Sequence, residues 1–444
     1  MPRVLIIGGG PAGLTAALRL AEHSYRVTLI DKRGAWGGRL MIDAERDQAD
    51  RIPHILMGCH HATRSMLKDL GVQSAFHTTS FDFVGSGSRR ARLHRPFMPG
   101  AWSTLLGIAA FRGVSIRDRC RLLAWLERTW ERDPGLATGL DSHTAEVWLR
   151  DIGQSEDARR RAWEPLCRFL LGDGLNIVSA APFITALATC FLSQRHDSEL
   201  KIPADTMSRL LVQPAVRRLN RFGVVLRLNT AATRIDMTAD RVTGVALEDG
   251  GRLTADWYIA AVPHAALAPL LPERAVTRFT YFQQLARLTD SPMLATHLRI
   301  EPAPAHAKLV LVEGRTYHWL VVKPNRDGGG AAVSFVSSGR PDLLGRPDEE
   351  LVEAALADWR AYHRGPAARA TDPHIVRDSG AGLSLRPGVQ ACRPLQQSPM
   401  SNFYVGGAWT DTGLPTTVES AIISGELCAQ GIAGKDHDPT PERH

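Results

Sequence analysis

The sequence predicts an α/β protein in which a parallel-sheet domain is interrupted by a helical insertion and by a second, mixed sheet. Three observations predict this class. The N-terminus reads as strand, glycine-rich turn, helix and strand; helical patterns dominate the middle of the chain; and short apolar strands dominate from residue 266 onward. A chain of 444 residues is long enough for two or three such units.

The first segment has the pattern of a dinucleotide-binding βαβ unit. An apolar strand over residues 3–7 runs into the turn Gly8-x-Gly10-x-x-Gly13, a helical stretch follows, and the next strand ends at the acid Asp31. The first glycine permits a tight turn, the second lets a pyrophosphate approach the backbone, and the third lets the helix pack on the strand. Amides at the helix N-terminus bind phosphate, and the acid accepts hydrogen bonds from a ribose. The pattern predicts a Rossmann-like domain whose cofactor contacts here are Gly8, Gly10, Pro11, Ala12, Gly13, Asp31 and Lys32.

A second glycine pair, Gly37-Gly38, lies shortly after this acid and is followed by Arg39. The pair lets the chain fold back over the pyrophosphate, where an arginine offsets the phosphate charge; a surface-loop arginine is the plainer interpretation of Arg39. The doublet is typical of FAD enzymes of the amine-oxidase and carotenoid-desaturase type, which the sequence resembles from this point on. We therefore predict FAD as the cofactor.

Helical spacing takes over after the first segment, and strands return near the end of the chain. The stretch at 104–111 is apolar nearly all round, which suits a core helix or a helix that faces an apolar substrate or lipid. Strands at 258–263 and near residue 405 complete the first sheet, so its domain is discontinuous. We predict FAD-binding segments at 1–75, 206–265 and 386–433, a helical insertion facing substrate and membrane at 76–205, a substrate-domain sheet at 266–385 and a disordered tail at 434–444.

Composition and charge argue against a nucleic-acid partner and against a membrane-spanning segment. Lys and Arg outnumber Asp and Glu by 53 to 46, but the basic residues are scattered, so we expect no nucleic-acid partner. The positive surplus suits peripheral contact with an anionic membrane. No apolar run is long enough to span a bilayer, and the N-terminus lacks the charge pattern of a signal peptide. We expect a cytoplasmic protein that makes its peripheral contact at the inner face of the membrane.

Cysteines and histidines give no pattern of a metal site. The six cysteines lie far apart without metal-ligand spacing, which is typical of free thiols. The pair His60-His61 has no further ligands near it in the sequence, so helix-surface histidines are the simpler interpretation. We expect no bound metal.

Taken over residues 1–433, the chain resembles the squalene-associated FAD enzymes, the hydroxysqualene dehydroxylases of hopanoid biosynthesis. Their wider relatives are the phytoene desaturases and amine oxidases. The most specific match is "WEPLC" at Trp163–Cys167. The other matching motifs are "GGGPAGLTAALRL", "GGRL", "HILMG", "SAAPF" and "TGLPTTVESAIISG". The resemblance implies that Gly37, Gly38, Arg39, Gly58, Ala232, Gly407, Pro415, Thr416, Thr417 and Val418 also contact FAD.

The chain departs from the pattern of this family at three places. Gly172 stands where the family has an asparagine, and Ile52-Pro53 precedes His54 where the family has Gly-Gln. Ala408 replaces an acid that accepts a hydrogen bond from the ribityl chain. These differences bear on the substrate more than on the cofactor.

The resemblance implies reductive removal of the hydroxyl of hydroxysqualene, with hydride delivered by reduced FAD. It also implies a hydrophobic isoprenoid substrate and an external electron donor or acceptor. His54 is the first candidate for the acid that protonates the leaving hydroxyl, with a structural histidine as the alternative, and Asp50 is the second candidate. A helix starting at Pro415 would direct amides at the pyrimidine edge of the flavin, and Glu419 on it is expected to make a structural hydrogen bond.

Three other functions remain open at this stage. A polyprenyl or carotenoid desaturase would use the same fold to introduce double bonds. An amine oxidase would carry an aromatic cage and a lysine near the flavin. A protein that uses FAD only as a stabilising group and acts as a scaffold for isoprenoid synthases would not turn over at all.

Overall fold

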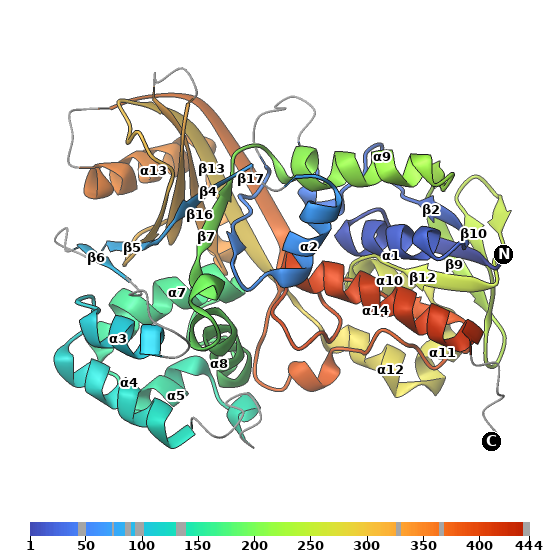
Figure 1. The fold of residues 1–444 in the computed structure, drawn as a ribbon, viewed down its shortest axis with the longest axis horizontal. Helices are drawn as coiled ribbons and strands as arrows, with labels where there is room; N and C mark the ends of the chain where they lie inside the picture. Colours follow the sequence, from blue (N-terminus) through green and yellow to red (C-terminus); the bar gives the residue numbers. More distant parts are fainter. Residues whose placement is uncertain are drawn as a thin grey trace.

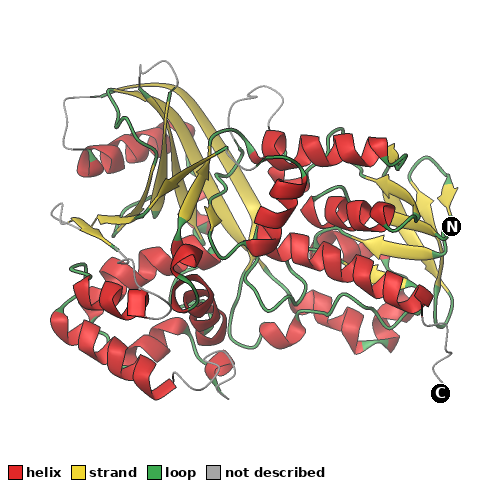
Figure 2. Cartoon of the chain, viewed as in Figure 1, coloured by secondary structure: helices red, strands yellow, loops and turns green. Residues whose placement is uncertain are grey.

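The computed structural model describes residues 1–42, 50–72, 75–84, 90–93, 102–129, 139–325, 330–363 and 368–437. These residues form three regions (Figure 1): one around a parallel sheet, one around a large twisted sheet, and a cluster of helices beside the large sheet. The parallel sheet and the large sheet lie at opposite ends of the molecule (Figure 2). The sequence-based prediction of an α/β fold with a mixed second sheet is confirmed.

The parallel sheet has the strand order β18-β12-β1-β2-β8, and every neighbouring pair in it is parallel. Its strands are β1 (Arg3–Ile7), β2 (Arg26–Ile30), β8 (Val225–Arg227), β12 (Trp257–Ala260) and β18 (Phe403–Val405). They come from three distant stretches of the chain, as a discontinuous domain requires. Ile6, Leu29 and Ile259 pair side by side on one face and are fully buried, and Leu5, Ile7 and Tyr258 are buried on the other face, so the strands are apolar on both faces.

Two helices from opposite ends of the chain pack against each other beside this sheet (Figure 1). They are α1 (Pro11–Glu22) and α14 (Val418–His437). A Cβ added at Gly425 of α14 would lie 2.3 Å from the Ala12 carbonyl oxygen, so only glycine permits this close crossing. The small residues of the C-terminal stretch therefore bring the last helix against the first glycine turn.

The remaining elements of this region surround the parallel sheet. The helices are α2 (His61–Asp69), α9 (Gln213–Arg221), α10 (His264–Leu267), α11 (Glu273–Arg278) and α12 (Thr280–Gln283). An antiparallel sheet is formed by β9 (Ala232–Met237), β10 (Val242–Leu247) and β11 (Arg252–Leu253), and a second small sheet by β3 (Leu56–Met57), β7 (Leu200–Pro203) and β4 (Phe76–Thr79).

The large sheet has the order β17-β13-β16-β15-β14-β5-β6 and is antiparallel except for the pair β14 and β5. Its strands are β5 (Phe81–Val84), β6 (Arg90–Arg92), β13 (Asp290–Glu301), β14 (Lys308–Val312), β15 (Trp319–Pro324), β16 (Ala331–Ser338) and β17 (Arg369–Leu383). Helix α13 (Asp348–Tyr362) covers one face through Leu351, Ala355 and Trp359, which share a core cluster with Phe335 of β16. The apolar residues of α13 therefore lie on one face of the helix, as in an amphipathic helix.

The segment at 76–205 is not wholly helical, which corrects the prediction made from the sequence. Strands β5 and β6 belong to the large sheet, and β4 and β7 pair with each other. Phe81 and Phe83 alternate with a polar residue and are buried, which is a strand pattern. The strand has only four residues, so its alternating pattern is too short to be recognised in a sequence where helical patterns surround it.

The helical part of that segment consists of short helices packed on the large sheet. They are α3 (Trp102–Ala110), α4 (Ile116–Thr129), α5 (Ala145–Asp151), α6 (Glu156–Ala158), α7 (Glu164–Leu171) and α8 (Ala180–Leu187), with π-helical turns at Arg159–Trp163 and Ala188–Leu192. Within the described residues, none of the helices combines the length and the apolar character needed to cross a bilayer.

The C-terminal helix differs from its predicted limits at both ends. It begins at Val418 rather than at Pro415, because the Thr417 hydroxyl accepts a hydrogen bond from the Ser420 amide (3.2 Å) and caps the helix. It continues to His437, so residues 434–437 of the predicted tail are helical. The rest of that tail, 438–444, lies outside the described residues.

Candidate functional site

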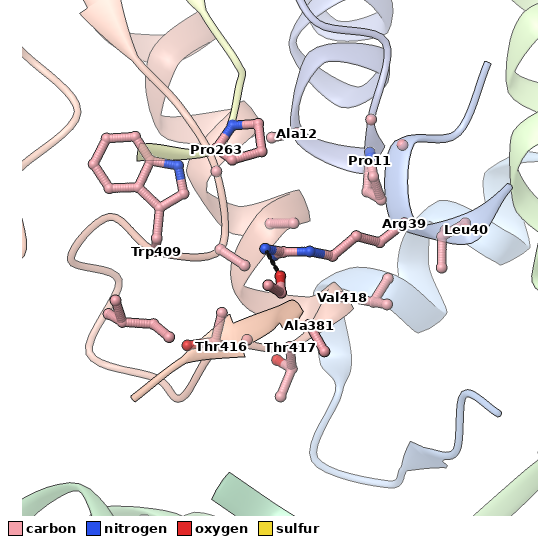
Figure 3. A pocket seen from close by; sticks show the side chains of 18 of the residues that line it. Pro11, Ala12, Arg39, Leu40, Pro263, Ala381, Trp409, Thr416, Thr417 and Val418 are labelled. Atoms are coloured by element: carbon pink, nitrogen blue, oxygen red, sulfur yellow. Dashed lines mark hydrogen bonds between the residues drawn. The ribbon is translucent and has the colours of Figure 1, made fainter. Parts of the chain in front are cut away.

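A cavity of about 1060 Å³ opens where the strands of the parallel sheet end and extends to the large sheet. The residues that follow β1, β12 and β18, namely Gly8, Ala261 and Gly407, all line it. Ligands of open α/β sheets bind at this carboxyl edge. Figure 3 shows the part of the wall formed by the first helix, Arg39 and the segment that leads into α14.

The first glycine turn requires glycine for steric reasons. Gly8 has φ +106°, and a Cβ there would lie 2.3 Å from the Ala261 carbonyl oxygen. A Cβ at Gly13 would lie 1.9 Å from the Gly8 carbonyl oxygen, so this glycine lets α1 approach the strand. Gly10 is different, since a Cβ there would meet only Gly38, at 3.9 Å. Its exposed backbone is therefore the surface that a pyrophosphate can approach.

The second glycine pair faces the first turn. The Gly37 amide donates to the Gly9 carbonyl oxygen (2.8 Å), and a Cβ at Gly38 would lie 3.0 Å from the Gly10 Cα atom. Both residues have positive φ, +117° and +58°. Two backbone turns without side chains thus enclose one end of the cavity.

Arg39 is not a surface-loop arginine. It lines the cavity and donates a hydrogen bond to the Gly380 carbonyl oxygen, at the β17 side of the wall beside Ala381 (Figure 3). A positive charge therefore stands at the meeting point of the two glycine turns and the large sheet. This is a suitable place to offset the charge of a pyrophosphate.

Asp31 is 8% exposed and is held by the amides of Gly9 (2.7 Å) and Arg33 (2.9 Å). It lines the cavity together with Lys32 and Ala232. Both carboxylate oxygens are fixed by backbone donors, and each retains lone pairs for a further donor. The acid is thus oriented as a ribose acceptor would be.

The segment before α14 forms another part of the wall. Pro415, Thr416, Thr417 and Val418 all line the cavity, and the Thr416 hydroxyl is shielded from solvent without a hydrogen-bond partner (Figure 3). The first amides of a helix have no acceptor within the helix. An unpaired hydroxyl and free amides at one cavity wall fit a ligand with polar edges.

Three predicted contacts do not line the cavity: Gly13, Gly37 and Gly58. The first two support the glycine turns. A Cβ at Gly58 would lie 1.6 Å from the His196 carbonyl oxygen, so this glycine serves the packing of α2 against a neighbouring turn. A position that has no room for a side chain requires glycine, whether the close neighbour is another part of the protein or a ligand. The sequence alone therefore does not separate glycines that contact a cofactor from glycines that permit packing.

His54 and Asp50 are electrostatically coupled. His54 lines the cavity, whereas Asp50 lies behind it and accepts a hydrogen bond from the Met207 amide (2.8 Å). Burial lowers the pKa of His54, while Asp50 acts to raise it. Burial raises the pKa of Asp50. Among the described residues, one oxygen of Asp50 and Nε2 of His54 are shielded and have no hydrogen-bond partner, so His54 Nε2 is available to a group bound in the cavity.

A second titratable pair at the cavity was not found from the sequence. Asp290, at the start of β13, lines the cavity, and its Oδ1 lies 3.1 Å from Nε2 of His264. The His264 ring lies 6.0 Å from the ring of Trp409, another wall residue. The two members of the pair are 26 residues apart, on α10 and β13, and belong to no recognisable motif, so no sequence signal joins them.

The histidine pair His60-His61 is not a metal site in the described part of the chain, where no cluster of three or more metal-binding side chains occurs. His60 faces the cavity, and its Nδ1 accepts the Met57 amide hydrogen (3.2 Å). His61 is largely exposed and lies beside Asp197. Only one of the two is therefore a helix-surface histidine.

The site has two glycine turns facing each other, an oriented acid, a cationic residue and an unpaired polar wall, which together fit a flavin dinucleotide. The sequence model of the flavin-containing amine oxidoreductases matches residues 11–433, which is almost the whole chain. The chain belongs to this family. It is a flavin-dependent oxidoreductase, and FAD is its cofactor.

Curated relatives of this flavoprotein include carotenoid-forming enzymes. It is 24% identical to a 15-cis-phytoene desaturase of Synechococcus elongatus, over 98% of this chain and 97% of the other. It is 23% identical to a zeta-carotene desaturase of Synechocystis, over 97% of each chain. A phytoene desaturase of an Oncidium hybrid is 24% identical over 98% of this chain and 78% of the other.

Solved structures with the same fold include cyclohexylamine oxidase from Brevibacterium oxydans and an oxidoreductase from Methanosarcina mazei. The first has a TM-score of 0.73 and 19% identity, and covers 98% of this flavoprotein and 99% of that chain. The second has a TM-score of 0.72 and 16% identity, and covers 98% and 100%. At these identities the likeness establishes the fold alone.

Proposed function

We propose that this flavoprotein acts on an isoprenoid lipid and removes the hydroxyl of hydroxysqualene reductively to give squalene. The resemblance of "WEPLC" and the C-terminal motif to the squalene-associated enzymes supports this choice. Relatives named for phytoene and zeta-carotene support the wider substrate class, since both names denote polyene hydrocarbons.

The observation that carries the proposal is the apolar wall of the cavity beyond the glycine turns. Wall residues there come from α7, α8, β13, β15 and β17. The apolar ones are Phe169, Leu170, Leu171, Ala186, Met293, Trp319 and Leu383. An isoprenoid chain gains about 25 cal/mol for each Å² of apolar surface that such a wall removes from water.

The wall gives little support to an amine substrate. The described wall carries the tryptophans Trp319 and Trp409 but no tyrosine, and its single lysine, Lys32, lies beside Asp31. An amine oxidase of this fold would carry a cage of Tyr or Trp and a lysine near the flavin, so the described wall offers only the tryptophan part of such a cage. We therefore do not propose amine oxidation.

We infer that the glycine turns, Asp31, Arg39 and the residues before α14 hold FAD, which supplies hydride when reduced. The chain itself must exclude water and protonate the leaving oxygen. Burial lowers the pKa of His54, the nearby Asp50 opposes that shift, and burial raises the pKa of Asp50 itself. We propose that His54 Nε2 gives a proton to the hydroxyl and that Asp50, which shows no hydrogen bond to His54 among the described residues, acts on it electrostatically.

Product mass tests the reaction. The purified holoprotein, chemically reduced under anaerobic conditions, is incubated with hydroxysqualene. We expect a product that has lost one oxygen and corresponds to squalene. No change in mass with hydroxysqualene, together with a normal flavin spectrum, would contradict this substrate.

The relatives favour a second candidate, desaturation of a polyene hydrocarbon, because their names are those of desaturases. The same preparation with oxidised FAD and phytoene decides between the two. A product two hydrogens lighter, with bleaching of the flavin, would favour desaturation over dehydroxylation.

The proposed role of His54 has its own test. We expect His54→Ala to keep its yellow FAD but to lose turnover by about 10²-fold or more, the usual contribution of a general acid. His54→Gln, which retains a hydrogen-bond donor without a transferable proton, should also be slow. Unchanged turnover in both variants would remove His54 from the mechanism.

We also propose that the corner between α3 and α4 contacts a membrane surface at the cytoplasmic face. Leu106 is 43% exposed and Ile116 is 71% exposed, and the exposed side chains of Arg112 and Arg117 lie nearby in the chain. Exposed apolar side chains with arginines suit an anionic lipid surface. Such a contact would bring a water-insoluble isoprenoid to the protein.

A further inference from the structure

A buried arginine stands behind the cofactor cavity without lining it. Arg393, between β17 and β18, is 5% exposed. Its guanidinium donates to the carbonyl oxygens of Thr410 (2.6 Å), Leu414 (2.8 Å), Ala408 (3.2 Å) and Trp409 (3.3 Å). One side chain therefore binds four carbonyls of a single segment.

That segment joins the last strand of the parallel sheet to α14, and it forms a wall of the cavity through Ala408, Trp409 and Leu414. Four of its carbonyls accept hydrogen bonds from the arginine, which does not itself line the cavity. A planar guanidinium with its donors in a fixed fork can hold several acceptors at once, which the single ammonium of lysine cannot match. The shape of this wall therefore depends on Arg393.

The charge of Arg393 is balanced mainly by dipoles. Its fifth hydrogen bond goes to the Gln390 side-chain oxygen (3.1 Å). The charge of Asp411 acts to raise the pKa of Arg393, although the described residues show no hydrogen bond between the two side chains. Asp411 itself accepts a hydrogen bond from the Gln390 side-chain amide (3.0 Å). Burial lowers the pKa of Arg393 to about 10, so the group stays charged at neutral pH.

We propose that Arg393 is a positioning residue for FAD: it fixes the cavity-facing segment and places a positive charge behind it. The first effect raises the affinity for FAD. The second raises the midpoint potential of bound FAD, because reduction adds negative charge close to a cation in a medium that screens weakly. The inference rests on FAD as cofactor and is independent of the substrate.

Two variants separate the two effects. Arg393→Lys keeps the charge but loses the fork of donors, whereas Arg393→Gln loses both. We expect the FAD dissociation constant, measured by fluorescence quenching with apoprotein, to rise at least about tenfold in both variants, as expected when hydrogen bonds of a charged group are lost. We expect the midpoint potential to fall in Arg393→Gln and to stay near the wild-type value in Arg393→Lys.

Arg377→Gln is the matched control. Arg377 of β17 also binds two backbone carbonyls, those of Leu344 (3.0 Å) and Arg346 (2.7 Å), but does so within the large-sheet region. The variant Arg377→Gln should leave the affinity for FAD and the midpoint potential of bound FAD unchanged. An equal effect of Arg377→Gln would overturn the proposal, because the response would then be general.

The remaining outcomes are also decisive. Wild-type FAD affinity in both Arg393 variants would overturn the positioning role, and a wild-type potential in Arg393→Gln would overturn the role of the charge. If Arg393→Gln does not fold, as judged by far-UV circular dichroism of the apoprotein, the affinity of Arg393→Lys decides the positioning role. Its potential then decides the charge: a wild-type value supports the proposal and a lowered one overturns it.

Discussion

Gly172 shows how one residue can differ from a family pattern without altering the fold. It ends α7 with φ +79° and lines the cavity, and its carbonyl accepts a hydrogen bond from the Ser291 hydroxyl (2.8 Å). The resembled family carries asparagine here. Glycine and asparagine are the residues that best tolerate the left-handed conformation after a helix, so the helix end is preserved. What changes is the cavity wall, which loses an amide.

Ala408 is the opposite case, because the lost acid is not replaced at the same position. Ala408 lines the cavity, and among the described residues its carbonyl accepts hydrogen bonds from Arg393 and from the Ser420 hydroxyl (3.1 Å). We expect the cofactor to rely here on backbone groups and on the Thr416 hydroxyl, which has no hydrogen-bond partner among the described residues. A sequence motif alone shows that the acid is absent, but not which groups line the cavity in its place.

His60 gives the protein a pH-dependent stability. Burial lowers its pKa from 6.5 to about 4, so in the native state the ring stays neutral at pH values where the unfolded chain has bound a proton. Its stabilising contribution is present above pH 6.5 and is lost as the pH falls toward 4, by up to about 3 kcal/mol. His60→Asn, which keeps an acceptor for the Met57 amide, should remove this part of the pH dependence.

Urea unfolding of wild type and His60→Asn between pH 7 and 4 measures this effect. The exposed neighbour His61 adds a smaller part of the shift through its charge, so His61→Asn should reduce the slope of stability against pH less than His60→Asn does. Parallel curves for wild type and His60→Asn would show that His60 is protonated equally in both states.

At the scale of elements, α14 organises the site through a carboxylate. Glu419 is 2% exposed and accepts hydrogen bonds from the amides of Ala62 (2.8 Å) and Thr63 (2.7 Å) and from the Thr63 hydroxyl (2.6 Å). It thereby caps the N-terminus of α2, where a negative charge is favourable. The structural hydrogen bond expected for Glu419 is confirmed, and it joins two helices whose first turns meet at the cavity.

Glu419→Ala should lower the free energy of unfolding by about 2–4 kcal/mol, because it leaves buried amides of α2 unpaired. Glu426→Ala on the same helix is the control. Its carboxylate pairs with Arg19 at 2.8 Å but is 24% exposed, so its loss should cost about 1 kcal/mol or less. Chemical denaturation measures both, and an equally small loss for Glu419→Ala would contradict the capping role.

At the scale of the whole molecule, the cavity lies between regions that share one core. A single cluster of buried residues includes Ile7 of the parallel sheet, Phe183 of the helical part and Trp319 of the large sheet. A ligand that fills a cavity between such regions binds the folded state only. FAD is therefore expected to stabilise the entire chain and not one domain.

The apoprotein should unfold at a lower temperature than the holoprotein, and free FAD should restore the difference. At a hundredfold excess over its dissociation constant, FAD stabilises the native state by about 2.7 kcal/mol. Differential scanning calorimetry at several FAD concentrations measures the shift. A melting temperature independent of FAD would contradict binding in the shared cavity.

The sequence by itself determined the parts of the site that depend on backbone geometry. A Cβ added at Gly8 or at Gly13 would lie 2.3 Å or 1.9 Å from a carbonyl oxygen, so both positions accept only glycine and their spacing can be recognised in the sequence. The strands around them follow from local apolar patterns. The oxidoreductase family and the FAD cofactor were therefore predictable from short motifs.

Only the tertiary structure decided which distant side chains meet. Glu419 and the start of α2 lie 356 residues apart in the chain and meet only in the folded protein. Asp290 and His264 are 26 residues apart, and Arg393 is 15 to 21 residues from the carbonyls that it binds, but in each case the partners belong to different elements that the fold brings together. The same holds for β5, whose place in the large sheet depends on pairing with β14. Such pairings are set by packing and burial over the whole fold, and no local pattern records them.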